Sequence, residues 1–297
     1  MRRVLVTGAN GFLGRNVAAQ LMARGVAVRS AVRVGRLSPG ESFEIGEVGP
    51  ETDWTAALAG CDAVIHTAAI VHRRARVDDL QRVNVAGTSR LALQAAEAGV
   101  RQFVFISSAG VFGAGRETLY TDSDPPAPVT AYARSKLEAE RALAKVQGLD
   151  ALILRPPMIY GRSAPGNFAR LARLVQSGLP LPLASIRNRR ALVHVDDIVA
   201  AIGAALEKFR PGSYALAGPE DVSTPQLARG IAAATGKSPL LLPFPPSWID
   251  AGARLTGRGP EIAALTYSFT LDDSRFSSDF DWRPVIGLAE GLRRSLP

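Results

Sequence analysis

The chain has 297 residues, of which 47% are hydrophobic and 21% are charged, and its formal net charge is +8. This composition excludes a largely disordered chain and is ordinary for a globular protein with a sizeable core. We expect no nucleic-acid partner, because the basic residues are scattered along the chain and aromatic residues make up only 6%.

The few cysteine and histidine residues also limit the possible chemistry. One cysteine, Cys61, cannot form an internal disulfide, and with three histidines at unrelated spacings it makes no zinc-ligand cluster. We therefore expect no metal, and we interpret the histidines as structural. The chain opens directly on a strand pattern and has no run near the ~20 apolar residues of a membrane span. The prediction is a cytoplasmic protein without a membrane span.

Strand and helix patterns alternate through the first two thirds of the chain. Predicted strands cover 2–8, 26–33, 62–69, 102–108 and 150–161. Predicted helices cover 12–25, 52–60, 78–99 and 131–146. Continuous apolar strands separated by helices indicate a buried parallel sheet with helices on both faces, the doubly wound α/β class known as the Rossmann fold.

The sequence pattern changes near Gly161, where prolines and glycines separate shorter predicted elements. Predicted helices follow at 167–183, 196–209, 224–236 and 245–257, with strands at 191–195 and 213–218. We therefore predict a dinucleotide-binding domain over 1–160 and a smaller, mixed, partly interleaved substrate lobe over 161–297. The region 191–199 is the candidate for a segment that returns to the first domain.

A glycine triplet, Gly8, Gly11 and Gly14, lies between the first strand and the first helix. Glycine lets the backbone turn tightly and approach a pyrophosphate, which the N–H groups of the helix N-terminus can then bind. At the end of the second strand, Arg33 stands where NAD-binding chains often have an acid, and Arg36 follows it. An arginine suits a 2′-phosphate, so the pattern favours NADP(H) over NAD(H); the alternative is that Arg33 stacks on adenine or faces water.

A tyrosine and a lysine are spaced one helical turn apart in "AYARSKLEAE". Tyr132 and Lys136 share one face of the helix predicted at 131–146. An ammonium beside a phenol favours the phenolate, so the pair could act as an acid and base. The alternative is an ordinary surface pair.

Together the glycine loop, the strand "FVFISSAGVFG" and the Tyr-x-x-x-Lys spacing resemble the extended short-chain dehydrogenase/reductase superfamily. The resemblance implies that Tyr132 is the catalytic acid and base and that Lys136 binds the nicotinamide ribose. It also implies a catalytic serine five residues before Gly113, which is Ser108 rather than Ser107. Members are often homodimers through the helices that carry Asn84 and Tyr132.

Within the superfamily the chain is similar to bacterial nucleotide-sugar 4-ketoreductases and 4-epimerases. This similarity implies substrate contacts, with Asn167, Arg189 and Arg190 near a UDP diphosphate. The implied cofactor contacts, besides the glycines, the two arginines and the catalytic pair, are Phe12, Leu13, Glu47, Val48, Ala68, Asn84 and Pro156. Epimerases usually carry a further arginine before the last aspartate-containing segment, and the segment "TYSFTLDDSRF" lacks it at that place.

These features predict an NADP(H)-dependent reductase of a UDP-4-keto-6-deoxy-N-acetylhexosamine. The alternative is a UDP-hexose 4-epimerase with the same Ser108, Tyr132 and Lys136. A more remote alternative is a regulator that binds the cofactor without catalysis.

Overall fold

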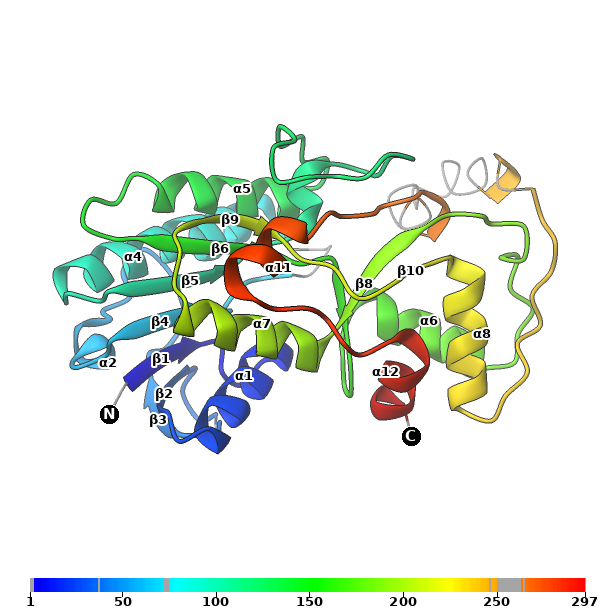
Figure 1. Ribbon diagram of the computed structural model, residues 1–297. Coiled ribbons are helices and arrows are strands. Elements are labelled where there is room, and N and C mark those ends of the chain that lie inside the picture. The colour runs from blue at the N-terminus through cyan, green and yellow to red at the C-terminus, as the bar shows by residue number, and fades with distance from the viewer. Residues whose placement is uncertain are drawn as a thin grey trace.

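A parallel sheet of seven strands runs through the N-terminal part of the chain (Figure 1). The computed structural model describes residues 3–36, 38–71, 75–245, 247–249, 263 and 265–296. The strand order is β3-β2-β1-β4-β5-β6-β9, and every pairing is parallel. The strands are β1 (Arg3–Thr7), β2 (Ala27–Val32), β3 (Glu41–Glu44), β4 (Ala63–His66), β5 (Gln102–Ile106), β6 (Ala151–Arg155) and β9 (Gly212–Ala215). The predicted doubly wound parallel sheet is confirmed.

Helices cover both faces of this sheet, as Figure 1 shows. One face carries α1 (Phe12–Ala23) and α7 (Val195–Glu207), and the other carries α2 (Thr55–Leu58), α4 (Thr88–Glu97) and α5 (Ala131–Leu143). Successive strand residues alternate between these cores: Val4 and Val6 pack in the first, and Leu5 in the second. Strands buried on both faces explain why the sequence shows unbroken apolar runs.

The helix predicted over 78–99 is helical but not uniform. It consists of α3 (Val77–Leu80), a π-helical segment over Gln81–Gly87 and α4. Helix α4 ends at Glu97, two residues before Gly99, whose φ of 72° is the left-handed value that suits glycine. A π segment in an otherwise α-helical run often marks a functional position, and Asn84 lies inside this one.

The strand predicted over 150–161 is wrong as a single element. The structure breaks it at Pro156 and Pro157 into β6 and β7 (Met158–Tyr160). Proline has no N–H to donate to a central ladder, so pairing with the large sheet stops there. Strand β7 instead joins a second sheet of three strands in the order β10-β8-β7, with β8 at Arg190–His194 and β10 at Asp221–Val222.

The region 191–199, predicted to return to the first domain, does so only in part. Strand β8 lies in the small sheet, whereas α7, which begins at Val195, packs on α1, and β9 is the seventh strand of the large sheet. Helix α11 (Ser274–Phe280) also joins the first core through Phe276 and Phe280. The chain therefore crosses between the two parts more than once.

The lobe at the right of Figure 1 has its own apolar core. It is formed by the small sheet with α6 (Asn167–Gln176), α8 (Thr224–Ala234) and α12 (Leu288–Ser295). The helix predicted over 245–257 lies largely outside the described residues, as does the histidine at position 72.

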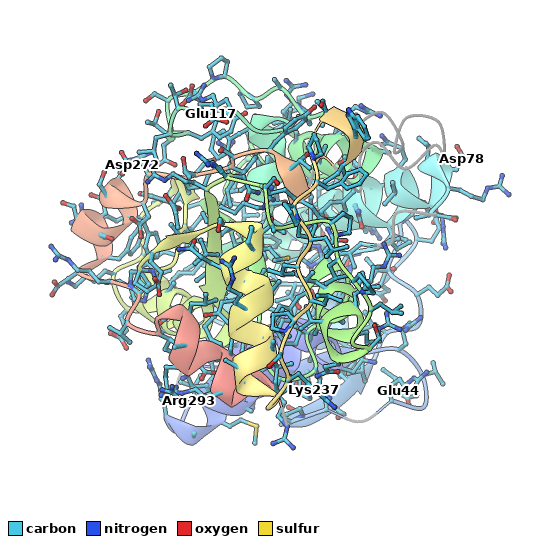
Figure 2. All side chains as sticks on the ribbon, turned by 90° about the vertical axis from the view of Figure 1, so that its right-hand side faces the viewer. Glu44, Asp78, Glu117, Lys237, Asp272 and Arg293 are labelled. Atoms are coloured by element: carbon cyan, nitrogen blue, oxygen red, sulfur yellow. The ribbon has the colours of Figure 1, made fainter. Side chains whose placement is uncertain are left out.

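Charged side chains of both signs surround the molecule. Figure 2 labels six of them at its periphery, Glu44, Asp78, Glu117, Lys237, Asp272 and Arg293. Among the described helices, none is both long enough and apolar enough to cross a membrane.

Candidate functional site

The turn between β1 and α1 is built so closely that only glycine fits at its key positions. Gly8 has a φ of 65°, and the N–H of Gly11 donates to its carbonyl oxygen at 2.8 Å. A Cβ atom at Gly14 would lie 2.3 Å from that same oxygen. The turn thus brings backbone to the start of α1, where Phe12 and Leu13 supply two of the helix's first N–H groups. This cradle fits the pyrophosphate of a dinucleotide.

The neighbouring strand ends complete the rim of the cradle. Ala68, after β4, donates its N–H to Thr7 Oγ1 at 3.3 Å and lies against Gly8. Arg33 and Arg36 follow β2 and are exposed. Such exposed arginines could reach a phosphate placed at this edge.

Two residues predicted to contact the adenine have partners within the protein. Glu47 accepts from Arg82 Nη2 at 2.9 Å, and a Cβ atom at Gly87 would lie 2.7 Å from Val48 Cγ1. The Glu47 carboxylate is thus held by an arginine of the π segment. Val48 packs against the same segment.

Helix α5 presents Tyr132 and Lys136 one turn apart, close to the end of β5. Thr130 caps the helix by accepting from Ala133 N at 3.1 Å, which fixes where the first turn begins. Lys136 is 2% exposed; its Nζ donates to the Ile106 carbonyl at 2.7 Å and lies 4.4 Å from the centre of the Phe105 ring. Burial lowers the pKa of Lys136 to about 7.

Burial acts on Tyr132 in the opposite direction and raises the pKa of its phenol. The phenolate needed to remove a proton therefore depends on positive charge nearby. Lys136 supplies one such charge when protonated, and an oxidised nicotinamide would add another. A depressed lysine pKa and a raised tyrosine pKa, side by side, are the pattern of a functional site.

The structure also separates the two candidate serines after β5. Ser107 is 3% exposed and donates to the Glu140 carboxylate. Ser108 is half-buried, and its Oγ accepts from Gly110 N at 3.1 Å, which leaves its own hydrogen for another acceptor. Ser108 is the serine that remains free to donate to a ligand.

Asn84 and Pro156 hold backbone near this site. Asn84 is 1% exposed; its Oδ1 accepts from Ile70 N at 2.8 Å, and its Nδ2 donates to Ser135 Oγ at 3.0 Å. Ser135 in turn donates to the Tyr132 carbonyl at 2.8 Å. The Pro156 carbonyl accepts from Ala109 N at 2.8 Å, directly after Ser108. Asn84 and Pro156 therefore each hold a backbone segment next to Tyr132 or Ser108.

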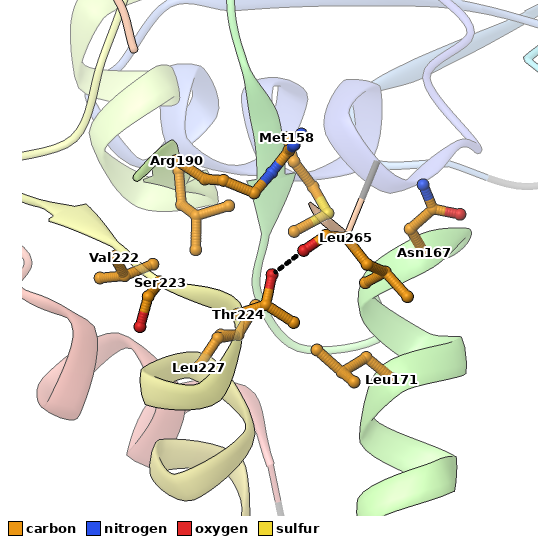
Figure 3. A pocket seen from close by; sticks show the side chains of 10 residues that line it. Met158, Asn167, Leu171, Arg190, Val222, Ser223, Thr224, Leu227 and Leu265 are labelled. Atoms are coloured by element: carbon orange, nitrogen blue, oxygen red, sulfur yellow. Dashed lines mark hydrogen bonds between the residues drawn. The ribbon is translucent and has the colours of Figure 1, made fainter. Parts of the chain in front are cut away.

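A cavity of about 160 Å³ opens between the small sheet, α6 and α8 (Figure 3). Its lining is mostly apolar, with Arg190 on β8 and Asn167 at the start of α6 among its polar groups. Arg190 Nη1 donates to the Tyr267 carbonyl at 3.0 Å. Burial lowers the pKa of Arg190 to about 10, and no carboxylate of the described residues forms an ion pair with it.

Arg189, which was grouped with Arg190, points elsewhere. Its side chain is 71% exposed and pairs with Asp221 at 3.0 Å, and it does not line the cavity. Adjacent residues of a strand point to opposite faces, so only one of the two can enter the same cavity.

Asn188, two residues before Arg190, connects the segments that form one wall of the cavity. It is 5% exposed, and its Nδ2 donates to Thr224 Oγ1, Leu265 O and Tyr267 O at 3.1, 2.9 and 3.2 Å. Its Oδ1 accepts from Thr224 N at 2.9 Å. These partners are 36 to 79 residues away in the chain, so no local sequence signal could identify this role.

Replacing Asn188 by alanine is expected to lower the free energy of unfolding by about 1–3 kcal/mol, because buried backbone groups lose their partners. Urea denaturation measures this loss. The control is Asn167→Ala, an exposed site where we expect a change within about 0.5 kcal/mol. Equal effects at the two positions would contradict the role given to Asn188.

Comparison with known proteins places these features in a wider group. The model of the NAD dependent epimerase/dehydratase family matches residues 4–217, which include all of the large sheet except Arg3, the first residue of β1. A UDP-glucose 4-epimerase of Vibrio cholerae is 35% identical over 99% of this chain and 94% of its own length. A 3 beta-hydroxysteroid dehydrogenase/Delta 5→4-isomerase of Mycobacterium tuberculosis is 31% identical over 99% and 90% of the two chains.

Other similar proteins broaden the range of substrates. A ceramide reductase of Caulobacter vibrioides is 30% identical over 97% of this chain and 88% of its own. Among solved structures, MoeE5 in complex with UDP-glucuronic acid and NAD has a TM-score of 0.82 and 26% identity, covering 99% of this chain and 97% of that chain. The fold is therefore shared by proteins whose named ligands differ in polarity.

Proposed function

The chain belongs to the NAD-dependent epimerase/dehydratase family of short-chain dehydrogenase/reductase-type enzymes, and from this premise we propose that it is a C4 epimerase of a UDP-linked hexose. The relative from Vibrio cholerae, similar over nearly the whole of both chains, bears this activity in its name. MoeE5, with UDP-glucuronic acid and NAD bound, supports the same ligand class.

The half-buried Arg190 is the observation that favours a nucleotide sugar. Its cation lies in a mostly apolar cavity and has a backbone carbonyl, rather than a carboxylate, as its protein partner. A diphosphate would compensate this charge through charge-assisted hydrogen bonds. A steroid or a ceramide chain in the same place would leave the cation without a counterion, which is costly. The cavity chemistry thus favours the ligand class of the epimerase over those of the other two relatives.

The residues of this chain can perform the proton chemistry of the reaction. The glycine loop and the start of α1 would hold the dinucleotide; when bound, its nicotinamide supplies reversible acceptance of the hydrogen that leaves sugar C4. Tyr132 takes the proton from the C4 hydroxyl while Ser108 donates to the same oxygen and orients it. Lys136 favours the phenolate form of Tyr132. The ketone would then turn its other face toward the cofactor site, where C4 would regain its hydride while Tyr132 returns the proton to the oxygen. Arg190 would retain the diphosphate throughout.

The test is incubation of the purified protein with UDP-glucose and, separately, UDP-N-acetylglucosamine, without added cofactor. Proton NMR follows the C1 and C4 signals of the sugar. The proposal expects conversion of at least one of them to its C4 epimer with no net cofactor consumption. No conversion, even with added NAD or NADP, would overturn the epimerase assignment.

A second candidate is the reduction of a UDP-4-keto-6-deoxy-N-acetylhexosamine with NADPH. The specific observation for it is Arg33 and Arg36, exposed at the end of β2 where an acid would suit NAD. A reductase consumes its cofactor and must exchange it, so stoichiometric NADPH oxidation with the 4-keto sugar would favour this candidate. No turnover of either substrate would favour the non-catalytic regulator.

The NADP(H) preference gives a separate prediction. Replacing Arg33 by aspartate should lower the ratio of NADPH to NADH affinity by about tenfold or more, because a charge-assisted contact to the 2′-phosphate becomes a repulsion. Fluorescence titration with both cofactors measures the ratio. Arg173→Asp, at an exposed position of α6, is the matched control and should leave it unchanged. A parent protein that binds NADH more tightly would contradict the NADP(H) preference itself.

The homodimer implied by the family resemblance stays a prediction, as does the cytoplasmic location. The outer faces of α4 and α5, which would meet in such a dimer, form a shallow hollow that includes Val85, Leu93, Glu138 and Arg141.

A further inference from the structure

A buried ion pair stands behind the Tyr132–Lys136 pair and has no part in the mechanism above. Glu140 follows Lys136 by one turn of α5 and is 5% exposed, and Arg155 at the end of β6 is 6% exposed. Arg155 donates to both oxygens of the Glu140 carboxylate, from Nε at 3.1 Å and from Nη2 at 2.6 Å. Ser107 donates to the same carboxylate. Three contacts therefore fix this anion in one orientation.

We propose that Glu140 is a positioning residue whose fixed carboxylate keeps the Lys136 ammonium charged beside Tyr132. The inference deepens the proposed function and rests on it, because it concerns the catalytic pair of that reaction. Glu140 acts through Lys136 and touches neither substrate nor cofactor in this account.

The surroundings of Lys136 explain why such a charge is needed. An ammonium has three donors, and Lys136 uses the Ile106 carbonyl and the Phe105 face, both from β5. His66 faces it from β4, and burial together with the lysine's charge lowers the pKa of that imidazole to about 3, so it is neutral. Among the described residues, these groups from β4 and β5 supply no negative charge, and Arg155 at the end of β6 adds a positive one.

From α5, Tyr132 is a protonated phenol, which leaves Glu140 as the carboxylate that acts on Lys136. Its negative charge raises the pKa of Lys136, against the burial that lowers it. Because Arg155 and Ser107 hold the carboxylate, Glu140 does not form a direct ion pair with Lys136 among the described contacts. The remaining N–H groups of the ammonium can therefore donate to a ligand, while the nearby Glu140 carboxylate still stabilises its positive charge.

The chain is well suited to a direct test, because it has only four lysines, Lys136, Lys145, Lys208 and Lys237. Lysine labelled with ¹³C at Cε allows NMR titration of each, and Lys136→Arg assigns the signal of Lys136. In Glu140→Gln the pKa of Lys136 should fall by about 1 to 2, the usual size of the effect of one nearby opposite charge.

The matched control is Glu138→Gln, two residues away on the same helix, where the side chain contacts Gln81 at the surface. It should leave the Lys136 titration unchanged. Glu140→Asp retains the charge and should keep the midpoint closer to that of the parent than Glu140→Gln does. A midpoint in Glu140→Gln equal to the parent value would overturn the proposal.

Glu140→Gln leaves Arg155 without its carboxylate and could prevent folding. The double variant Glu140→Gln with Arg155→Met removes both charges, which buried pairs often tolerate. Loss of the Arg155 cation acts in the opposite direction, so the proposal expects a smaller fall of the midpoint there; a midpoint no lower than that of the parent in this folded protein would also overturn it. The titration needs no substrate, so its failure is distinguishable from failure of the proposed reaction, which the sugar conversion measures.

Discussion

Replacing Tyr132 by phenylalanine is expected to lower kcat for C4 interconversion by about 10²–10⁴-fold, the usual contribution of a positioned acid and base. The substitution removes one oxygen and leaves the ring, so packing at the start of α5 is retained. The measurement is the initial rate of sugar interconversion under saturating substrate.

The matched control is Tyr214→Phe, at the β9 edge of the large sheet, where the hydroxyl contacts Asp279 at 3.2 Å. It should leave kcat within about twofold, because a half-exposed hydrogen bond far from the reaction contributes only to stability. Cofactor content and thermal midpoint should be the same in Tyr132→Phe and the parent. A loss of less than tenfold in folded Tyr132→Phe would show that another group carries the proton.

Replacing Arg190 by methionine is expected to weaken UDP binding by about 10- to 150-fold, because hydrogen bonds to charged groups contribute about 1.5–3 kcal/mol. Titration calorimetry with UDP and with uridine measures how much the diphosphate contributes to binding, because uridine lacks it. The parent should bind UDP more tightly than uridine, and the difference should shrink in Arg190→Met.

Arg189→Met is the matched control, one residue away in the chain. Its guanidinium is exposed and paired with Asp221, so its removal should change UDP affinity by less than about threefold. Equal losses in the two variants would mean that a general positive field, rather than a fixed contact in the cavity, attracts the ligand.

The parts of the structure that could be predicted are those where local pattern and tertiary packing agree. The apolar strands of the large sheet are buried on both faces, so composition alone identifies them. The glycine loop was predictable because a Cβ atom at Gly14 would collide with the Gly8 carbonyl. Tyr132 and Lys136 share a face because helical periodicity requires it.

Other features depend on contacts between distant segments. Strand β3, with the sequence ESFE, was not predicted because an exposed edge strand carries charges instead of an apolar run. The break at Pro156 became clear only when β7 was seen to join another sheet. Asn188 acquires its role from residues up to 79 positions away. The family spacing already favoured Ser108, but the partners of Ser107, the buried Glu140 carboxylate and through it Arg155, could not be predicted from any spacing.

Substrate class is the property that fold and family determine least. Relatives of similar identity have names that refer to sugars, steroids and ceramide. A nucleotide sugar is therefore favoured by one half-buried cation, Arg190, and the cavity that it lines.

The most direct test of the central claim uses UDP-glucose that carries deuterium at C4. The purified protein, with Tyr132 and Arg190 intact, is incubated with it in ordinary water, and the product is analysed by NMR and mass spectrometry. We expect UDP-galactose with deuterium retained at C4, because the hydrogen leaves and returns to the same carbon. Absence of product, or product whose deuterium has exchanged with water, would contradict it.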